Sequence, residues 1–203
     1  YRGERPVLSG GRRITGWKTA RVNGRDLWVT DLASVRAGEW FFREVWVSGE
    51  RRGRARHPNR GYLALVDVPE AKADAPWHEG DAGFRFKEGD LLPWPTVTNA
   101  EVRVMSRWVE SHLPVLRVDA AERRVAFAKK SVFKLDPGDL YYIEHALELL
   151  DQPGEWYLDR TSGMLYLYPP EDMAAADINL SISTQNIITI DAAAHIRLIG
   201  IQI

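Results

Sequence analysis

The sequence contains no cysteine, which excludes disulfide bonds and thiolate metal sites. It has no apolar run near the roughly 18 residues that a membrane-spanning helix needs, so we expect no membrane partner. Lysine and arginine total 27 and aspartate and glutamate total 28, which gives a formal net charge of −1. Because a balanced charge provides no long-range attraction for nucleic acid, we expect no nucleic-acid partner either.

Motifs for several kinds of catalysis are also missing. The sequence has no Gly-x-Ser-x-Gly nucleophile elbow and no glycine-rich phosphate loop. Its histidines do not show the spacing of metal ligands, so we expect no metal site, and nothing indicates a cofactor. The five histidines are His57, His78, His112, His145 and His195.

Aromatic side chains are frequent, with eight tryptophans and seven tyrosines. Two interpretations stay open: the rings fill the core of a β-domain, or some are exposed and stack on sugar rings. Residues 69–96 are rich in proline and glycine, which predicts a long loop. Loops on a rigid scaffold often carry binding residues, so Trp77 and Trp94 are candidate substrate-binding residues.

Residues 154–170 predict a β-hairpin. Two aromatic-rich runs flank a short polar turn that ends in Gly163, and such residues suit a pleated, half-buried surface. The preceding segment 142–150 has apolar residues at the spacing of one helix face, which predicts a short helix.

Most of the remaining chain has the pattern of antiparallel strands. Asn23-Gly24 between two β-like runs is a strong hairpin signal. Residues 100–108 alternate between apolar and polar side chains, and 113–119 and 124–128 predict a further hairpin. We therefore expect a mainly β fold, an antiparallel β-barrel or sandwich with one short helix.

The C-terminal residues follow a different pattern. Short isoleucine-rich segments occur at 178–182, 187–190 and 195–201, with separators too short for crossover helices. Short strands at such close spacing predict coils of a parallel β-helix. Because the sequence begins at Tyr1 without a leader and ends within this apolar alternation, we expect a fragment of a longer protein.

The run 51–60 is the only dense group of basic residues. It could bind a phosphate, a nucleic acid or the carboxylate of a uronate, and Arg54 and Arg56 are its candidate substrate-binding residues. The alternative is a solvated strand edge whose arginine stems cover apolar surface.

Hydrolysis by acid–base catalysis often uses two carboxyl groups, one as acid and one as base or nucleophile. Three carboxylates stand out by their position: Glu144 on the predicted helix, and Asp136 and Asp139 near its start. We interpret Glu144 as a helix surface residue and Asp136 and Asp139 as N-cap residues. His145 follows Glu144 directly, but adjacent helix positions point to different faces. The residues themselves thus give no catalytic pair.

Five segments of the sequence match a known arrangement: 1–17 (YRGERPVLSGGRRITGW), 27–32 (LWVTDL), 45–59 (VWVSGERRGRARHPN), 141–169 (YYIEHALELLDQPGEWYLDRTSGMLYLYP) and 186–203. Taken together, these segments resemble the inserted β-domain of right-handed parallel β-helix proteins, many of which are carbohydrate-active enzymes of bacteria. The last segment looks like the β-helix resuming after the insertion.

The resemblance implies a division of the chain and a function for the parent protein. Residues 1–16 would end an N-terminal β-helix coil, 17–172 would form the inserted antiparallel β-domain, and 173–203 would begin the resumed right-handed parallel β-helix. The parent would be a glycoside hydrolase that is secreted or periplasmic. Its catalytic carboxylates would lie beyond Ile203, so the fragment itself would not be catalytic.

Three roles remain open for the domain. It could be an accessory domain that forms one side of the substrate cleft and contacts an oligo- or polysaccharide. It could instead be purely structural, capping an edge of the β-helix. The third possibility is a carbohydrate-binding part of a lyase that acts on acidic polysaccharides, with the arginine run neutralising uronates.

Overall fold

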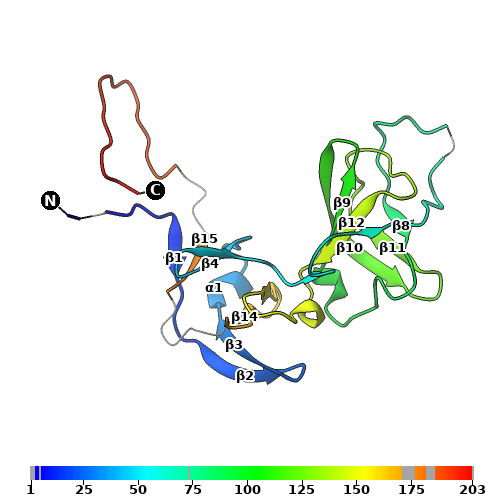
Figure 1. Ribbon diagram of the computed structural model, residues 1–203, viewed down its shortest axis with the longest axis horizontal. Helices are drawn as coiled ribbons and strands as arrows, with labels where there is room; N and C mark the ends of the chain where they lie inside the picture. The colour runs from blue at the N-terminus through cyan, green and yellow to red at the C-terminus, as the bar shows by residue number, and fades with distance from the viewer. Residues whose placement is uncertain (1–2, 5, 73, 171–176, 182–185, 203) are drawn as a thin grey trace.

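The computed structural model describes residues 3–4, 6–72, 74–170, 177–181 and 186–202. These residues form antiparallel sheets in two lobes that lie side by side (Figure 1). A single short α-helix, α1 (Ala33–Arg36), occurs among them. The sheets are not closed into a barrel, so the mainly β prediction is confirmed in its sandwich form.

The first lobe consists of two four-stranded sheets with the orders β1-β15-β4-β5 and β13-β14-β3-β2. The predicted turn at Asn23-Gly24 is confirmed, since both residues have positive φ angles and join β2 to β3. The strands are β1 (Gly11–Arg13), β2 (Lys18–Val22), β3 (Arg25–Asp31), β4 (Val45–Val47), β5 (Glu50–Arg52), β13 (Trp156–Leu158), β14 (Met164–Leu167) and β15 (Ile178–Ser181).

The second lobe is a seven-stranded sheet with the order β6-β12-β9-β10-β11-β8, and β7 also pairs with β12. Two 3₁₀ turns, η1 (Val97–Asn99) and η2 (Leu147–Leu149), accompany it. Its strands are β6 (Arg56–His57), β7 (Leu63–Ala64), β8 (Gly83–Arg85), β9 (Glu101–Ser106), β10 (Val109–Asp119), β11 (Arg124–Phe127) and β12 (Leu140–Glu144).

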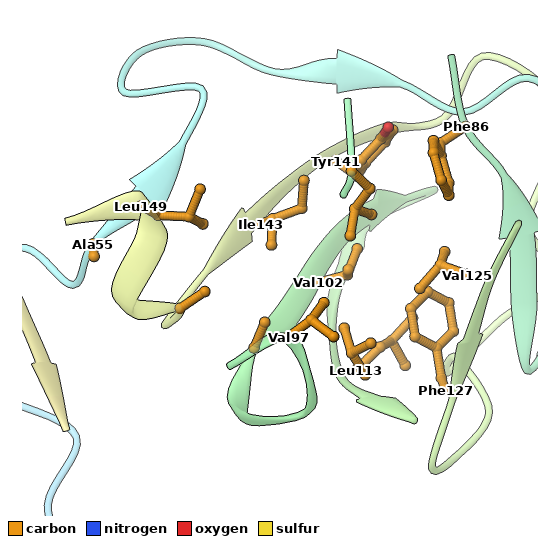
Figure 2. Packing of buried hydrophobic residues seen from close by; sticks show 14 of the residues in the cluster. Ala55, Phe86, Val97, Val102, Leu113, Val125, Phe127, Tyr141, Ile143 and Leu149 are labelled. Atoms are coloured by element: carbon orange, nitrogen blue, oxygen red, sulfur yellow. The ribbon is translucent and has the colours of Figure 1, made fainter. Parts of the chain in front are cut away.

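Each lobe has its own hydrophobic cluster. The larger core gathers residues from most strands of the seven-stranded sheet, together with Leu27 and Val29 of β3. Figure 2 shows Tyr141, Val102 and Phe127 pointing into it. The smaller core lies between the two four-stranded sheets of the first lobe, where Val45, Leu180 and their neighbours are fully buried.

The predicted hairpin at 154–170 is confirmed, with β13 and β14 paired antiparallel. It lies between the two cores. Trp156 and Leu158 belong to the smaller core, while Tyr157 between them belongs to the larger core. Because successive side chains of a strand point to opposite faces, one strand contributes to both cores. This double burial explains why the hairpin is so rich in large apolar and aromatic residues.

The helix expected within 142–150 is wrong. Residues 140–144 form strand β12, which pairs with β9 on one side and with β6 and β7 on the other. Only the turn η2 follows it. The apolar spacing also fits a strand, because Tyr141 and Ile143 alternate with residues on the opposite face. The neighbouring strands, which the local pattern could not reveal, decide the outcome.

The described C-terminal residues 186–202 contain no strand, so the strands expected at 187–190 and 195–201 are wrong for this chain. No neighbouring strand among the described residues bonds their backbone. Their single bridge joins Gln202 to Val7 in parallel orientation. Residue 182 and the expected boundary at 172/173 lie outside the described residues, and the β-helix and domain limits stay predictions.

Candidate functional site

A cleft of about 640 Å³ lies where β9, β10 and β12 meet the segment 43–56. Three acidic residues, one histidine and one tyrosine face it. Most of its other lining residues are arginines, namely Arg43, Arg51, Arg52, Arg54, Arg56 and Arg103.

The backbone of residues 53–57 places two of these arginines in the cleft. This segment bridges the lobes, because Arg54 pairs with Trp156 of β13 and Arg56 pairs with Glu144 of β12. In such an extended segment alternate residues share a face. Arg54 and Arg56 therefore both face the cleft, while Ala55 between them is fully buried in the larger core.

Arg54 lies in a buried network of ion pairs. Its Nη1 donates to Oε1 of Glu144 at 2.6 Å and to Oε2 of Glu101 at 3.2 Å. Arg103 on β9 donates to the same Glu144 oxygen through Nε at 2.8 Å and Nη2 at 2.5 Å. Because a buried charge is stable only when paired and hydrogen-bonded, these four residues depend on one another.

Glu101 connects this network to the first lobe. Oε2 of Glu101 accepts from Nη2 of Arg43 at 2.5 Å, and Oε1 lies 3.6 Å from Nη2 of Arg160 in the β13–β14 turn. Burial alone would raise the pKa of Glu101, but Arg54, Arg43 and Arg103 together lower it. Glu101 is therefore ionised at neutral pH and cannot serve as a general acid.

Glu144 and His145 are buried, so the interpretation of Glu144 as helix surface is wrong. The Nδ1 atom of His145 accepts a hydrogen bond from Nε of Arg54 at 3.3 Å. Burial and the nearby Arg54 charge lower the pKa of His145 well below its usual value. His145 is therefore neutral and helps to position Arg54.

Asp136 and Asp139 lie in the turn before β12, and no helix follows them, so their interpretation as N-cap residues is wrong. The Oδ2 atom of Asp139 accepts from the backbone N–H of Asp136 at 2.9 Å. Asp136 also pairs with Arg107 at 3.2 Å. Both carboxylates thus stabilise local turns.

The other predicted arginine, Arg56, has different partners. Its guanidinium carbon lies 3.9 Å from the ring centre of Tyr142, and its Nε and Nη2 donate to the backbone carbonyls of Pro58 and Gly61. The strand-edge interpretation of the basic run fits Arg51 in β5, which is exposed, but it is wrong for the buried Arg54.

The predicted tryptophans lie apart from each other. Trp77 is 50% exposed and belongs to an aromatic cluster with Trp108 and Phe133. Its ring centre is 5.8 Å from that of Trp108 and 5.3 Å from that of Phe133. Trp94 instead packs, half-buried, against the larger core. Trp77 is thus available to a ligand, and Trp94 mainly supports the fold.

Sequence reasoning missed Trp108, which is 71% exposed, and Phe133. Trp108 lies in the tight β9–β10 turn, beside Arg107 with its φ of 54°. A tryptophan at the tip of a hairpin cannot reach the core of its own sheet. This position in a predicted turn could have indicated that Trp108 is exposed. Its proximity to Trp77 follows only from the fold.

Two classes of site are absent within the described ranges. No helix there is long and apolar enough to cross a membrane. The same ranges hold no group of three or more histidine, aspartate or glutamate residues arranged to bind a metal ion.

Comparisons with known proteins place this β-domain in a family. Residues 25–170 match the GH141 insertion domain, and the chain belongs to that family. A solved structure named "Glycoside hydrolase" is similar, with a TM-score of 0.62 and 25% sequence identity over 87% of this chain. The match covers 32% of that structure, so the chain spans about a third of its length. No curated protein matches the chain.

Proposed function

We propose that this chain is the accessory domain of a secreted β-helix glycoside hydrolase, where it forms one side of the substrate cleft and contacts an oligo- or polysaccharide. The match to the GH141 insertion domain and the similarity to a glycoside hydrolase structure support this role. The catalytic carboxylates lie in other parts of the parent protein.

The exposed aromatic cluster is the observation that carries the proposal. Trp77, Trp108 and Phe133 have ring centres 5.0 to 5.8 Å apart, and both tryptophans are open to solvent. Exposed groups of large aromatic rings are characteristic of interaction surfaces. The flat apolar face of a sugar ring suits such a surface, while the sugar hydroxyls remain hydrated.

The carboxylates of the cleft favour binding over hydrolysis. Hydrolysis needs one carboxyl group that can give up a proton and a second that acts as base or nucleophile. Glu144, and Glu101 behind it, are held by buried arginines. Glu110 accepts from Nη1 of Arg103 at 2.9 Å, and Glu44 pairs with Arg51 at 3.3 Å. The pKa of Glu155 is raised to about 7, but Glu155 does not line the cleft.

Two observations support a β-helix partner. The bridge between Val7 and Gln202 is parallel, as it would be between neighbouring coils, and Gln202 both accepts from Leu8 and donates to Pro6. The C-terminal segment also exposes several large apolar side chains, among them Ile199 at 80%. Adjacent coils of a β-helix would cover these side chains.

Titration with saccharides tests the proposal. We expect the intrinsic tryptophan fluorescence of the chain to change with a neutral oligosaccharide such as xylotriose or galactotriose. By calorimetry, the double variant Trp77→Ala/Trp108→Ala should bind roughly 30-fold more weakly, because each of the two rings contributes on the order of 1 kcal/mol. Trp46→Ala, at a half-exposed tryptophan on β4 outside the cluster, is the control.

The same titration separates the alternatives. If no saccharide changes the fluorescence or binds in the calorimeter, the domain has the purely structural role of capping the β-helix. If the purified chain hydrolyses glycosides and loses this activity on substitution of Glu101 or Glu144, the catalytic centre lies in this domain and the accessory role is wrong.

A further inference from the structure

The charges that line the cleft are unequal. Six arginines face it, against the three carboxylates of Glu44, Glu110 and Glu144. Adding Glu101, which lies behind the lining and pairs with three of the arginines, still leaves cations in excess. Because the whole chain has a formal net charge of −1, this positive potential is a local property of the cleft.

The arginines have two different roles. Arg54 and Arg103 are buried and bonded to Glu144, so the fold needs their pairs. Arg51 and Arg56 lie at the more exposed part of the lining. Arg51 pairs at 3.3 Å with Glu44, which is itself only partly buried, so neither arginine neutralises a buried carboxylate. The floor of the cleft is thus formed by arginines that the fold needs, while Arg51 and Arg56 are not needed to pair buried carboxylates.

Some donors at the cleft have no acidic partner. The guanidinium of Arg56 bonds only to backbone carbonyls, and the described residues place no carboxylate within ion-pair distance of it. The Nε atom of Arg52 is buried and out of reach of a ligand, so Arg52 can contact one only through its outer nitrogens. Its Nη2 pairs with Glu50, a mostly exposed residue. A guanidinium without a carboxylate partner, or with only an exposed one, can pair with an anion from a ligand.

The size of the cleft fits a sugar-sized ligand. Its volume of about 640 Å³ lies within the range of roughly 300 to 1,000 Å³ that is typical of small-molecule sites. The bonds among Arg54, Arg103 and Glu144 hold the floor in place before any ligand arrives. A site that is already ordered loses less entropy on binding.

We propose that this cleft binds an anionic group of a saccharide, a carboxylate or a sulfate ester, through Arg51, Arg52 and Arg56. The inference rests on the proposed saccharide-binding function and names the chemical class of the saccharide. A guanidinium presents parallel N–H donors that match the two oxygens of such an anion. A neutral sugar would leave the excess positive charge uncompensated.

His112 provides an internal reporter of the charge in the cleft. Its Nε2 lies 3.0 Å from Oε1 of Glu110. Burial, Arg103 and Arg43 lower the pKa of His112, while Glu110 and Glu101 act in the opposite direction. An anion bound to the arginines would offset part of their effect, so the pKa of His112 should rise on binding.

Calorimetry with three trimers tests the inference. The ligands are trigalacturonate, its methyl ester, which has the same rings without charge, and a sulfated galactotriose. We expect the carboxylate trimer or the sulfated trimer to bind the full 203-residue chain at least about tenfold more tightly than the ester, because charged hydrogen bonds are the stronger ones. Added salt should weaken this preference.

A matched pair of variants locates the binding. Arg51→Gln/Arg56→Gln should lose about tenfold or more in affinity for the charged trimer, because each removes a charged donor. Arg21→Gln/Arg25→Gln makes the same change of net charge in the β2–β3 hairpin and should bind as the unchanged protein does. NMR titration of His112 should show a higher pKa with the charged trimer, and the shift should disappear in the cleft variant.

The outcomes separate this inference from the proposed function. Equal affinity for trigalacturonate, ester and sulfated trimer, or an unchanged affinity in the cleft variant, overturns the anion site. If the ester still binds at Trp77 and Trp108 in that case, the saccharide-binding function stands without the anion site. If no trimer binds, both are wrong. A preference for the sulfated trimer over trigalacturonate identifies a sulfate ester as the anion.

Discussion

The larger and the smaller core are assembled from different parts of the chain. The larger core is built mostly from residues 55–150, and its central strands β9, β10 and β11 follow one another as hairpins. The smaller core takes Ile14, next to β1, and residues of β15, which lie at opposite ends of the described strands, together with β4 and the β13–β14 hairpin. Nearby strands pair at low entropic cost, while the smaller core requires distant segments to meet.

This difference shows how the domain depends on its surroundings. The family match at 25–170 contains all strands of the second lobe, but it excludes β1, β2 and β15 of the first. All buried residues of the larger core lie within the matched range, although Ala20 and Val22 of β2 pack against it from outside. The smaller core is completed by flanking residues, and these residues also carry the parallel bridge at Val7.

The largest expected loss of stability comes from removing a large side chain of β13 from each core in turn. Trp156→Ala removes a fully buried indole from the smaller core, and Tyr157→Ala removes a fully buried ring from the larger core. Each should lower the free energy of unfolding by about 3 to 5 kcal/mol. Chemical denaturation measures the loss, and amide hydrogen exchange measures where protection falls.

The location of the lost protection tests the comparison. With Trp156→Ala we expect the fastest exchange in β4 and β15, the partners of the smaller core. With Tyr157→Ala we expect it near Asn99, whose side chain donates to the Tyr157 hydroxyl at 2.7 Å. If both variants open the same strands, the two cores form one cooperative unit and the distinction is wrong.

A smaller loss is expected from the ion pairs that join the lobes. Glu101→Gln removes the charge that pairs with Arg54 on the bridging segment and with Arg43 of the first lobe. Leaving these cations without their partner should cost about 2 to 4 kcal/mol in unfolding free energy. Urea unfolding measures the effect, and a double-mutant cycle with Arg43→Gln isolates the contribution that crosses the lobes.

The control for this variant is an exposed ion pair of 3.1 Å, close in length to the 3.2 Å pair between Glu101 and Arg54. Asp26→Asn breaks the pair between Asp26 and Arg21, whose side chains are both mostly exposed. Exposed pairs contribute about 0 to 1 kcal/mol, so this change should be small. An equally small effect for Glu101→Gln would mean that the buried network does not hold the lobes together.

Sequence reasoning succeeded where the determinants are local. The Asn23-Gly24 turn and the hairpin around Gly163 follow from turn residues and alternation, which act over a few positions. It failed at 142–150, where the apolar spacing fits both a helix and a strand. The neighbouring strands, which the local sequence does not show, make this segment a strand. Local patterns predicted individual strands but not how they assemble. The resemblance to an inserted β-domain added the prediction that they form one antiparallel domain.

The candidate site was predicted only in part for the same reason. Arg54 and Arg56 belong to one run, and their shared face could be anticipated from a spacing of two residues. The burial of Arg54 could not, because its partners Glu101 and Glu144 are on strands distant in sequence. The exposed cluster of Trp77 and Trp108 likewise joins two loops that only the fold brings together.

The smallest effect concerns Glu155, another buried carboxylate, which lies just before β13. Its Oε2 accepts from the backbone N–H groups of Asp151 and Gln152, each at 3.1 Å. Burial raises the pKa of Glu155 to about 7, partly opposed by these hydrogen bonds, and Asp151 raises it further. Glu101 is buried as well, yet its arginine partners lower its pKa.

The two carboxylates therefore affect stability in opposite pH ranges. The pKa of Glu155 rises from 4.5, the ordinary value for a glutamate, to about 7 on folding, so the folded chain binds more protons than the unfolded chain between these two pH values. Its stabilising contribution is complete below that window and is lost as the pH rises through it. The contribution of Glu101 is present at neutral pH and is lost on acidification.

Glu155→Gln should remove the pH dependence of stability that Glu155 contributes. We expect the unfolding free energy of the unchanged chain to include a fall on the order of 1 to 3 kcal/mol between about pH 4.5 and 8 that the variant lacks. Urea unfolding at several pH values measures it, with Glu122→Gln on the exposed β10–β11 turn as the matched control. If Glu155→Gln and the control have the same pH profile, backbone N–H groups stabilise the Glu155 carboxylate as well as arginines stabilise Glu101, and the contrast between the two sites disappears.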